Sequence, residues 1–588
     1  MVKAFALNAV RLFPGRIRDR QSLTSRYLLE LDPDRLLHNF RVNAGLPSSA
    51  KPLGGWESPR CGLRGHFVGH YLSACAQMYA ATGDERFKQR VESLVVELGK
   101  CQQSLGGGYL SAFPQSEFGA LEEKFSGTWA PYYVLHKIMA GLLDAYRDGR
   151  CALAGEMAQK MGDWVAARIE KLPSDRLEPM LRTDQLNPSN EYGGIGESLY
   201  DLYAAFGNQR HLTAAQTFDR AWFLDPLMSG RDELAGLHAN THIPQVLAAA
   251  RRFEVTGDNR YRRAVEYFWE RTALARSYVN GGSSGPRPDR KERSEGGEHW
   301  PLAESLLGTL TPRINESCVV HNMVRLTDVL YRWSCQTRFA DFRERVFLNS
   351  VLCQQHPAFP GGYLYAHPLA GASRKVYGDF DNTFWCCYGT SVEAFARLAD
   401  GIYFHDEQTL WVNQFVASEL VWPQKLLKLI QETDFPFQPK TRLVVRSSGP
   451  VEITIKIRVP TWAVGAACRL NDQLVASPCL AGSYVTISRV WRDGDAVELT
   501  LPMELRVETL PGDASMAAFL YGPTVLAART PHVTELGEPA SASRSLVQAV
   551  DVSRLKFQVT LASGTVAPLV PLNEVVDEAY GVYFKLPG

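Results

Sequence analysis

The sequence predicts a multidomain α+β protein in which an α/α barrel, residues 1–408, precedes a β-sandwich region, residues 409–588. Three observations predict this fold. The 588 residues are more than one hydrophobic core normally holds. Apolar residues recur at helical spacing as far as Phe404 and alternate in short runs after Leu410. Similar helical hairpins also recur within the first part, as expected for a repeat architecture.

The helical hairpins share a turn with the same three residues. Segments 72–91 and 246–265 each predict a helix, a Thr-Gly-Asp turn and a second helix, with Gly83 and Gly257 supplying the left-handed backbone at the end of the first helix. Such hairpins build either a linear solenoid or a closed barrel. Long loops rich in glycine and aromatic residues separate them, and a closed barrel gathers these loops at one mouth. We therefore favour the barrel.

The second part predicts short strands. Runs such as Leu443–Ser447, Val451–Arg458 and Ser483–Ser488 alternate apolar and polar residues, and Pro, Gly and Asp separate them. This pattern is typical of an antiparallel β-sandwich with one or two modules. Residues 1–20 lie outside the helical pattern and are candidates to pack on the sandwich.

Composition excludes several classes of function. Lys plus Arg and Asp plus Glu both number 63, so no overall field favours nucleic acid or an anionic membrane. No uncharged apolar run is long enough to span a bilayer. Residues 1–20 lack the apolar core of a signal peptide, which predicts a cytoplasmic location, or a periplasmic one if a leader has been removed.

Two short motifs about 70 residues apart indicate a metal site. Glu316 and Cys318 form a Glu-x-Cys motif, and Cys386 and Cys387 are adjacent. Three thiols and one carboxylate are the kind of donor set that tetrahedral Zn²⁺ takes. Each cysteine could equally be an ordinary buried residue, but the pairing of the two motifs favours zinc.

A long glycine-rich loop, residues 280–313, carries a candidate general acid. Glu298 lies there in Gly-Gly-Glu-His-Trp, where an aromatic neighbour is expected to desolvate the carboxyl and raise its pKa. A loop of this length between helices is either functional or disordered, and a solvated glutamate is the alternative.

Histidines and aromatic residues in glycine-bearing segments indicate a site for a neutral sugar. His66 and His70 lie in RGHFVGHY, His136 in WAPYYVLH and His238 in LHANTH. Aromatic faces with fixed polar groups suit a sugar ring, although any one of these histidines could be a core residue. Walker and HExxH motifs are absent from the sequence. The Gly-x-Ser-x-Gly spacing at residues 281–285 lies in the glycine-rich loop and not at a strand-to-helix turn, so it is no nucleophile elbow. Both observations argue against phosphoryl transfer and serine hydrolase chemistry.

Taken together, these segments resemble a known family. NESCVVHNMVRLTDVLYRW, TFWCCYGTSVE, RGHFVGHYLSA, VLHKIMAGLLDAY, NEYGGIGE and HANTHIPQVLAAARRFEVTGD are similar to the β-L-arabinofuranosidase glycoside hydrolases of families 127 and 146. The resemblance runs from about Val10 into the sandwich. It implies an (α/α)₆ barrel followed by β-sandwich modules.

The resemblance also implies roles for individual residues. Zinc would be held by Glu316, Cys318, Cys386 and Cys387, with Cys386 as nucleophile and Glu298 as acid/base. The sugar contacts would be His136, His238 and Tyr365, and we add His66 and His70 from the histidine-rich segment. The implied reaction is retaining, exo-acting hydrolysis of a β-L-arabinofuranoside in a plant-type or bacterial oligosaccharide or glycoconjugate.

The sequence departs from the family pattern close to these residues. Ser317 replaces the usual threonine, Val319-Val320-His321 replaces more polar residues, and Tyr388 and Ser391 alter the stretch after the cysteines. These changes bear on which furanoside is cleaved, so a different furanoside remains an alternative. A carbohydrate-binding or scaffold protein with structural zinc is a second alternative, and a zinc-dependent lanthionine-type cyclase is a third.

Overall fold

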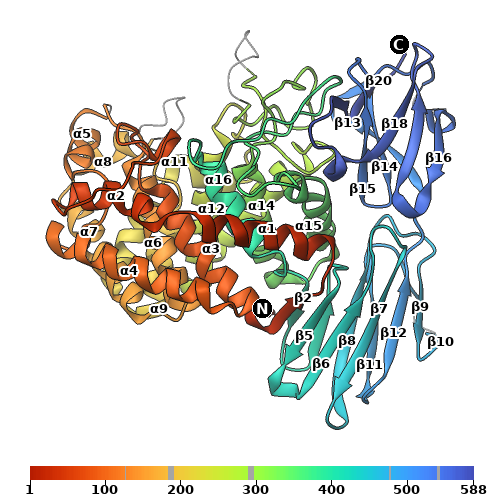
Figure 1. The fold of residues 1–588 in the computed structure, drawn as a ribbon, viewed down its shortest axis with the longest axis horizontal. Helices are drawn as coiled ribbons and strands as arrows, with labels where there is room; N and C mark the ends of the chain where they lie inside the picture. Colours follow the sequence, from red (N-terminus) through yellow and green to blue (C-terminus); the bar gives the residue numbers. More distant parts are fainter. Residues whose placement is uncertain (126, 183–190, 289–296, 476–477, 540–542, 588) are drawn as a thin grey trace.

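The computed structural model describes residues 1–125, 127–182, 191–288, 297–475, 478–539 and 543–587. Its helical part lies beside two regions of β-sheet (Figure 1). The predicted fold class is confirmed. Within the described residues, no helix is both long and apolar enough to cross a membrane.

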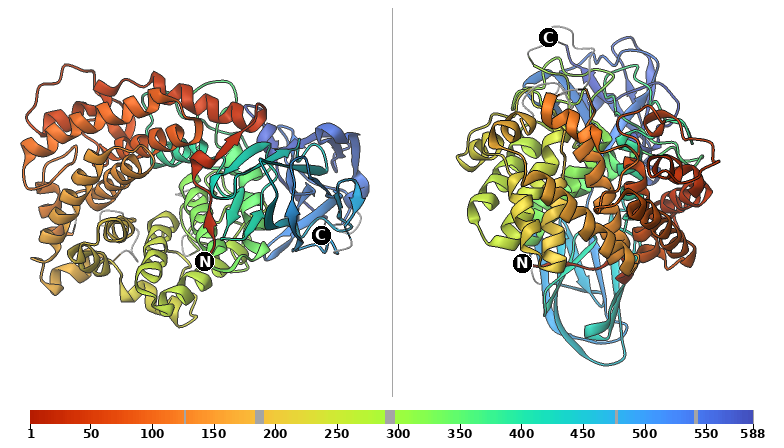
Figure 2. Two further views of the ribbon diagram at one scale, coloured as in Figure 1. Left: turned by 90° about the horizontal axis from the view of Figure 1, so that it is seen from below. Right: turned by 90° about the vertical axis from the view of Figure 1, so that its left-hand side faces the viewer.

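Six helices form a closed inner ring in which each contacts the next and the last contacts the first (Figure 2). A second set packs outside this ring, which makes an (α/α)₆ barrel. The inner helices are α3 (His66–Thr82), α6 (Pro131–Arg147), α9 (Ile195–Phe206), α12 (Ala239–Thr256), α14 (Ser317–Ser334) and α16 (Cys386–Ala396). The outer helices are α1 (Arg16–Glu30), α4 (Glu85–Leu105), α7 (Ala152–Ile169), α10 (Gln209–Thr217), α13 (Asn259–Trp269) and α15 (Thr337–Asn349). Shorter or peripheral helices are α2 (Pro33–Asn43), α5 (Ser116–Lys124), α8 (Ser174–Met180) and α11 (Ala221–Met228).

The predicted hairpin turns are confirmed in detail. Gly83 and Gly257 end α3 and α12 with φ values of 73° and 72°, a region that residues with a Cβ adopt at a cost. Asp84 and Asp258 then cap the next helix, each accepting a hydrogen bond from the backbone N–H two residues on. The same three residues therefore stop one helix and start the next at both places.

Two sheets form the middle domain. The five-stranded sheet has the order β1 (Lys3–Ala4), β3 (Tyr403–His405), β4 (Thr409–Val412), β8 (Val451–Val459) and β11 (Ser483–Trp491). The seven-stranded sheet has the order β10 (Gln473–Leu474), β9 (Ala467–Leu470), β12 (Ala496–Thr500), β7 (Lys440–Ser447), β6 (Leu427–Glu432), β5 (Ser418–Trp422) and β2 (Val10–Leu12). The N-terminal β1 and β2 thus pair with strands from beyond residue 400. The sheets are antiparallel, as expected, except that β4 and β8 run parallel.

The last sheet forms a separate C-terminal domain. Its order is β13 (Leu505–Leu510), β14 (Asp513–Tyr521), β15 (Thr524–Arg529), β18 (Val566–Pro571), β17 (Lys556–Thr560) and β16 (Val547–Asp551), with β19 (Tyr580–Gly581) on β15 and β20 (Tyr583–Lys585) on β14. In Figure 1 this domain lies at the upper right, beside the loops at the top of the barrel. The site described next lies among those loops.

Candidate active site

The two cysteine motifs meet because their helices are neighbours in the inner ring and begin at the same end of the barrel. Glu316 directly precedes α14 and Cys318 lies in its first turn, while Cys386 and Cys387 are the first residues of α16. Their four donor atoms all lie within 4.8 Å of one another. Both thiol-bearing segments sit at helix N-termini, where the helix dipole favours thiolates.

The geometry of this cluster suits a tetrahedral metal. The Cys318 and Cys387 sulfurs are 3.3 Å apart and the Cys386 and Cys387 sulfurs 3.9 Å, too far for a disulfide. Ligands 2.3 Å from zinc in a tetrahedron lie about 3.8 Å from one another. Glu316 places Oε1 3.7 Å from the Cys386 sulfur, and its buried Oε2 has no partner among the described residues.

The charges in this cluster also favour a cation. Burial raises the pKa of the Cys387 thiol, and burial together with the Cys318 sulfur raises the pKa of Glu316 well above its usual value. Four acidic groups therefore share one dry site and cannot all ionise by themselves. A divalent cation relieves that conflict, so the residues fit zinc.

Glu298 is held from both sides by two other predicted site residues. The Nε2 atom of His238 lies 3.0 Å from Oε2 of Glu298, and the Tyr365 hydroxyl donates to Oε1 at 2.5 Å. Thr241 donates its backbone N–H to Nδ1 of His238, which in neutral histidine puts the proton on Nε2, facing Glu298. The 280–313 loop reaches this position through paired backbone hydrogen bonds between His299 and Gly285, with residues 289–296 outside the described part.

The expected rise in the pKa of Glu298 is wrong for the free site. Burial does raise it, but the hydrogen bonds from His238 and Tyr365 outweigh burial and lower the pKa to about 2. His238 shows the matching effect: burial lowers its pKa, and the Glu298 carboxylate raises it above the usual value by more. His238 and Glu298 therefore share one proton, and in the free protein this proton resides on His238 while Glu298 is ionised.

His136 lies on α6 beside the cysteine cluster. It lines a small cavity together with Tyr133, Glu191, Cys318 and Thr390. Its Nδ1 accepts a hydrogen bond from the Gly194 N–H at 3.2 Å. A Cβ at Gly194 would lie 2.7 Å from the ring, so this contact requires glycine there. Burial lowers the pKa of His136 well below its usual value and keeps the ring neutral.

His66 and His70 lie one turn apart on α3, and each has a carboxylate close to its Nδ1 atom. Nδ1 of His66 donates to the Leu63 carbonyl at 2.7 Å and lies 3.0 Å from Glu57, while Nδ1 of His70 is 2.5 Å from Glu393. Both Nε2 atoms are buried without a partner among the described residues. The His70 ring is covered by α16, because a Cβ on Gly389 would lie 2.1 Å from it.

Glu393 and Thr390 lie at the site although neither is among the residues predicted from the sequence. Thr390 places its hydroxyl 3.4 Å from the Cys318 sulfur, and Glu393 contacts His70 and, at 3.7 Å, His321 of α14. They follow Cys386 by four and seven residues, the spacing that puts side chains on one face of a helix. Helical spacing counted from the Cys-Cys pair could have found them.

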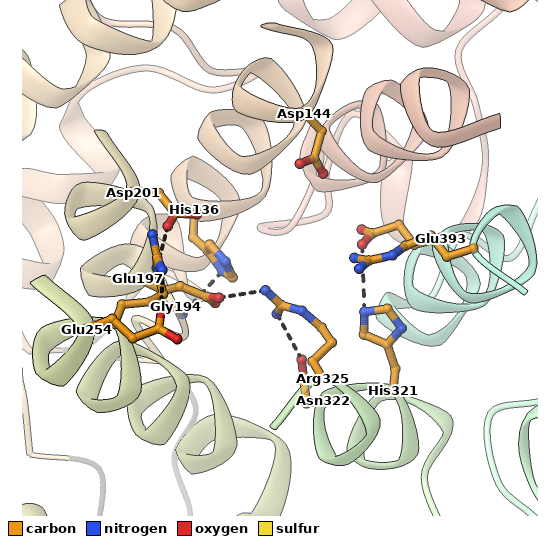
Figure 3. Close-up of polar contacts among 12 residues, drawn as sticks. His136, Asp144, Gly194, Glu197, Asp201, Glu254, His321, Asn322, Arg325 and Glu393 are labelled. Carbon is orange, nitrogen blue, oxygen red and sulfur yellow. Dashed lines mark hydrogen bonds and ion pairs between the residues drawn. The ribbon is translucent and has the colours of Figure 1, made fainter. Parts of the chain in front are cut away.

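A polar network fills the barrel interior near these residues (Figure 3). Arg325 of α14 donates to Glu197 of α9 at 2.6 Å, and Asn322 donates to Asn240 of α12 at 3.0 Å. His136 and Gly194 lie at one side of the network, and His321 and Glu393 at the other (Figure 3). These contacts tie together the helices that carry the candidate site.

The sequence matches two family models. The model of the GH127 β-L-arabinofuranosidase catalytic domain covers residues 9–400, and the model of the GH127 middle domain covers residues 409–503. No protein with a curated description matches the sequence.

Solved structures share the fold over the whole chain. A GH127 β-L-arabinofuranosidase from Geobacillus stearothermophilus T6 is 18% identical, with a TM-score of 0.75 over 98% of this chain and 100% of that one. Another GH127 β-arabinofuranosidase is 17% identical, with a TM-score of 0.74 over 100% of this chain and 98% of that one. Because the catalytic-domain model spans well over half of the sequence, the chain belongs to the GH127 β-L-arabinofuranosidase family and is a glycoside hydrolase.

Proposed function

We propose that this glycoside hydrolase is an exo-acting, retaining β-L-arabinofuranosidase with Cys386 as its nucleophile. The observation that carries the proposal is exposure within the cysteine cluster. Cys386 is 7% exposed, whereas Glu316, Cys318 and Cys387 are 2% exposed or less. Cys386 is thus the most exposed of the four donors, and we assign the attack on substrate to its sulfur. The carboxyl of Glu298, 29% exposed, is the nearby group that can exchange a proton with the substrate.

Zinc is the proposed cofactor, held by Glu316, Cys318, Cys386 and Cys387. When bound, it would keep Cys386 ionised at neutral pH, where a free thiol is mostly protonated. The start of α16 adds the field of a helix N-terminus to the same sulfur.

In the first displacement, the Cys386 sulfur attacks the anomeric carbon and the bond from that carbon to the leaving oxygen breaks. Protonated His238 passes a proton to Glu298 across their 3.0 Å hydrogen bond, and Glu298 passes it on to the leaving oxygen, which leaves Glu298 ionised and His238 neutral. In the second displacement, Glu298 accepts a proton from water as the water oxygen attacks the same carbon. The carbon–sulfur bond breaks and its electron pair returns to sulfur. Two inversions retain the configuration.

Of the remaining predicted site residues, most are proposed sugar contacts and one, His70, is proposed to hold a helix in position. We assign His136, His238 and Tyr365 to the sugar hydroxyls, because His136 lines a cavity with Cys318 and the other two bind Glu298. We keep His66 as a further proposed sugar contact, because its buried Nε2 has no partner among the described residues. His70 was predicted to bind the sugar as well. Its ring is covered by α16 and bound to Glu393, so we assign it to holding α16 in place. The proposed substrate is an arabinofuranosyl oligosaccharide or glycoconjugate.

Replacing the nucleophile tests the proposal directly. Cys386→Ser should release no measurable arabinose from any β-L-arabinofuranoside, because a serine hydroxyl is not ionised at neutral pH. Cys353→Ser is the matched control, since Cys353 is also buried and lies outside the cluster. The control should keep its activity and about one zinc per chain. An active Cys386→Ser enzyme, or a wild type that cleaves no β-L-arabinofuranoside, would refute the proposal.

Replacing the acid/base should give a different defect. Glu298→Gln should lose about a hundredfold to ten-thousandfold on an alkyl furanoside, and much less on an aryl furanoside whose leaving group needs no proton. Added azide should restore rate on the aryl substrate, because it attacks without a general base. Equal losses on both substrates without azide rescue would remove Glu298 from this role.

A further inference from the structure

Four aromatic side chains form a continuous wall beside Glu298. This aromatic wall consists of Trp56, Trp129, Tyr365 and Trp385. Trp56 lies before α3, Trp129 lies before α6, and the other two lie between α15 and α16. Tyr365 connects the wall to the proposed chemistry, because its hydroxyl donates to Glu298 while its ring packs on two of the tryptophans.

The rings of the wall meet edge to face and do not cover one another. Tyr365 lies 5.5 Å from Trp385 at 83° and 6.4 Å from Trp56 at 74°, and Trp56 lies 5.0 Å from Trp129 at 68°. All four side chains are only half-buried. Each of the four residues therefore keeps some surface that is exposed to solvent, and Tyr365 contacts the acid/base directly.

Backbone contacts fix one member of the wall, Trp56, in place. The backbone N–H of Trp56 bonds to the Thr383 carbonyl, and the Gly54 N–H bonds to the Asp381 carbonyl. Gly55 has a φ of 52°, and a Cβ there would lie 2.1 Å from the Thr383 oxygen, so the two segments touch backbone to backbone. Trp56 is thus fixed against the segment that leads to Trp385 and Cys386. A preformed aromatic surface binds a ring without the cost of ordering loops.

We propose that the aromatic wall is the subsite for the leaving group and that it selects substrates whose leaving group contains a second sugar ring. This inference rests on the proposed function, in which Glu298 protonates the leaving oxygen. The leaving group must then lie against Glu298, on the side where Tyr365 holds that carboxyl. A sugar ring presents C–H faces that pack on aromatic rings, whereas a methyl group covers almost none of the wall.

The test compares two substrates that differ only in the leaving group. The wild-type enzyme should show a higher kcat/KM for a β-L-arabinofuranosyl disaccharide than for methyl β-L-arabinofuranoside. In Trp129→Ala, the ratio of the two kcat/KM values should fall about fivefold to tenfold, as expected for the loss of one stacked ring. Trp129→Tyr should recover most of the ratio. Trp56→Leu should lower it as well, and gives a second position if Trp129→Ala fails to fold.

A tryptophan far from the site provides the control. Trp462 is also half-buried but packs on Phe435 in the middle domain, so Trp462→Ala should leave the ratio unchanged. An unchanged ratio in both Trp129→Ala and Trp56→Leu would overturn the subsite while leaving the proposed function intact. A wild type that hydrolyses neither substrate would overturn both.

Discussion

Both β-sheet regions contact the outer helix α15, but only the C-terminal domain also contacts the loops that form the candidate site. The middle domain holds the barrel through buried ion pairs on an outer helix and through the far end of α14. Arg458 of β8 bonds to Asp341 at 2.5 Å and to Glu344, both on α15, and Tyr484 bonds to Tyr331. Tyr331 lies thirteen residues beyond Cys318 along α14, or about 20 Å away. These contacts therefore do not involve residues of the candidate site.

The C-terminal domain also holds the loops that form the site. The Tyr583 hydroxyl accepts the backbone N–H of Val279, and the Tyr580 hydroxyl donates to the carbonyl of Pro368, three residues after Tyr365. Tyr278, Val279, Leu306 and Leu369 belong to the same apolar core as residues of β13, β14 and β15. The loop that carries Glu298 therefore depends on the last domain for its hydrophobic core. We expect damage to the middle domain to reduce stability, and damage to the C-terminal domain to reduce catalysis.

The largest expected effect is on stability and comes from the middle domain. Arg458→Met should destabilise the protein by about 3–5 kcal/mol, because it leaves the buried Glu344 and the nearby Asp341 without their cation. Urea denaturation measures the loss. The exposed pair of Arg442 and Glu432 is the control, and Arg442→Met should cost about 1 kcal/mol or less. If Arg458→Met folded but lost activity, the assignment of stability to the middle domain and catalysis to the C-terminal domain would be wrong.

The second effect is on catalysis and comes from the C-terminal domain. Tyr583→Phe leaves the buried N–H of Val279 without an acceptor, which should cost about 1–3 kcal/mol and loosen the Glu298 loop. We expect kcat on an alkyl furanoside to fall more than kcat on an aryl furanoside. Tyr484→Phe removes a comparable hydroxyl from the middle domain and should change neither rate. Equal kinetics in the two variants would contradict the comparison.

These domain contacts mark the limit of what the sequence could predict. Helical spacing and the Thr-Gly-Asp turns were enough for the barrel, and two short motifs were enough for the donor cluster. The parallel pairing of β4 with β8 could not be predicted, because strand direction depends on the connection and not on alternation. The lowered pKa of Glu298 could not be predicted either, because His238 and Tyr365 reach it from 60 and 67 residues away. The apolar core that supports the Glu298 loop includes residues beyond position 504, which are still more distant in the sequence.

The smallest expected effect depends on pH and concerns an ion pair between the barrel and the C-terminal domain. Glu508 of β13 binds Arg345 of α15 through two contacts of 2.7 and 2.8 Å. Burial raises the pKa of Glu508, but Arg345 lowers it by more, so the pKa lies below its usual value. Such a group stabilises the fold above its unfolded pKa of about 4.3, and this contribution is lost as the pH falls toward the folded value.

Glu508→Gln should therefore destabilise the protein at neutral pH by at most about 1 kcal/mol, because both partners are partly exposed to solvent. The difference from wild type should shrink as the pH falls below about 4, where the unfolded carboxyl is protonated as well. Urea denaturation at a series of pH values measures it. Glu432→Gln, in the exposed pair of the middle domain, should show a smaller difference at every pH. A Glu508→Gln difference that persisted at acid pH would mean that packing, and not the charge of Glu508, joins the C-terminal domain to the barrel at this point.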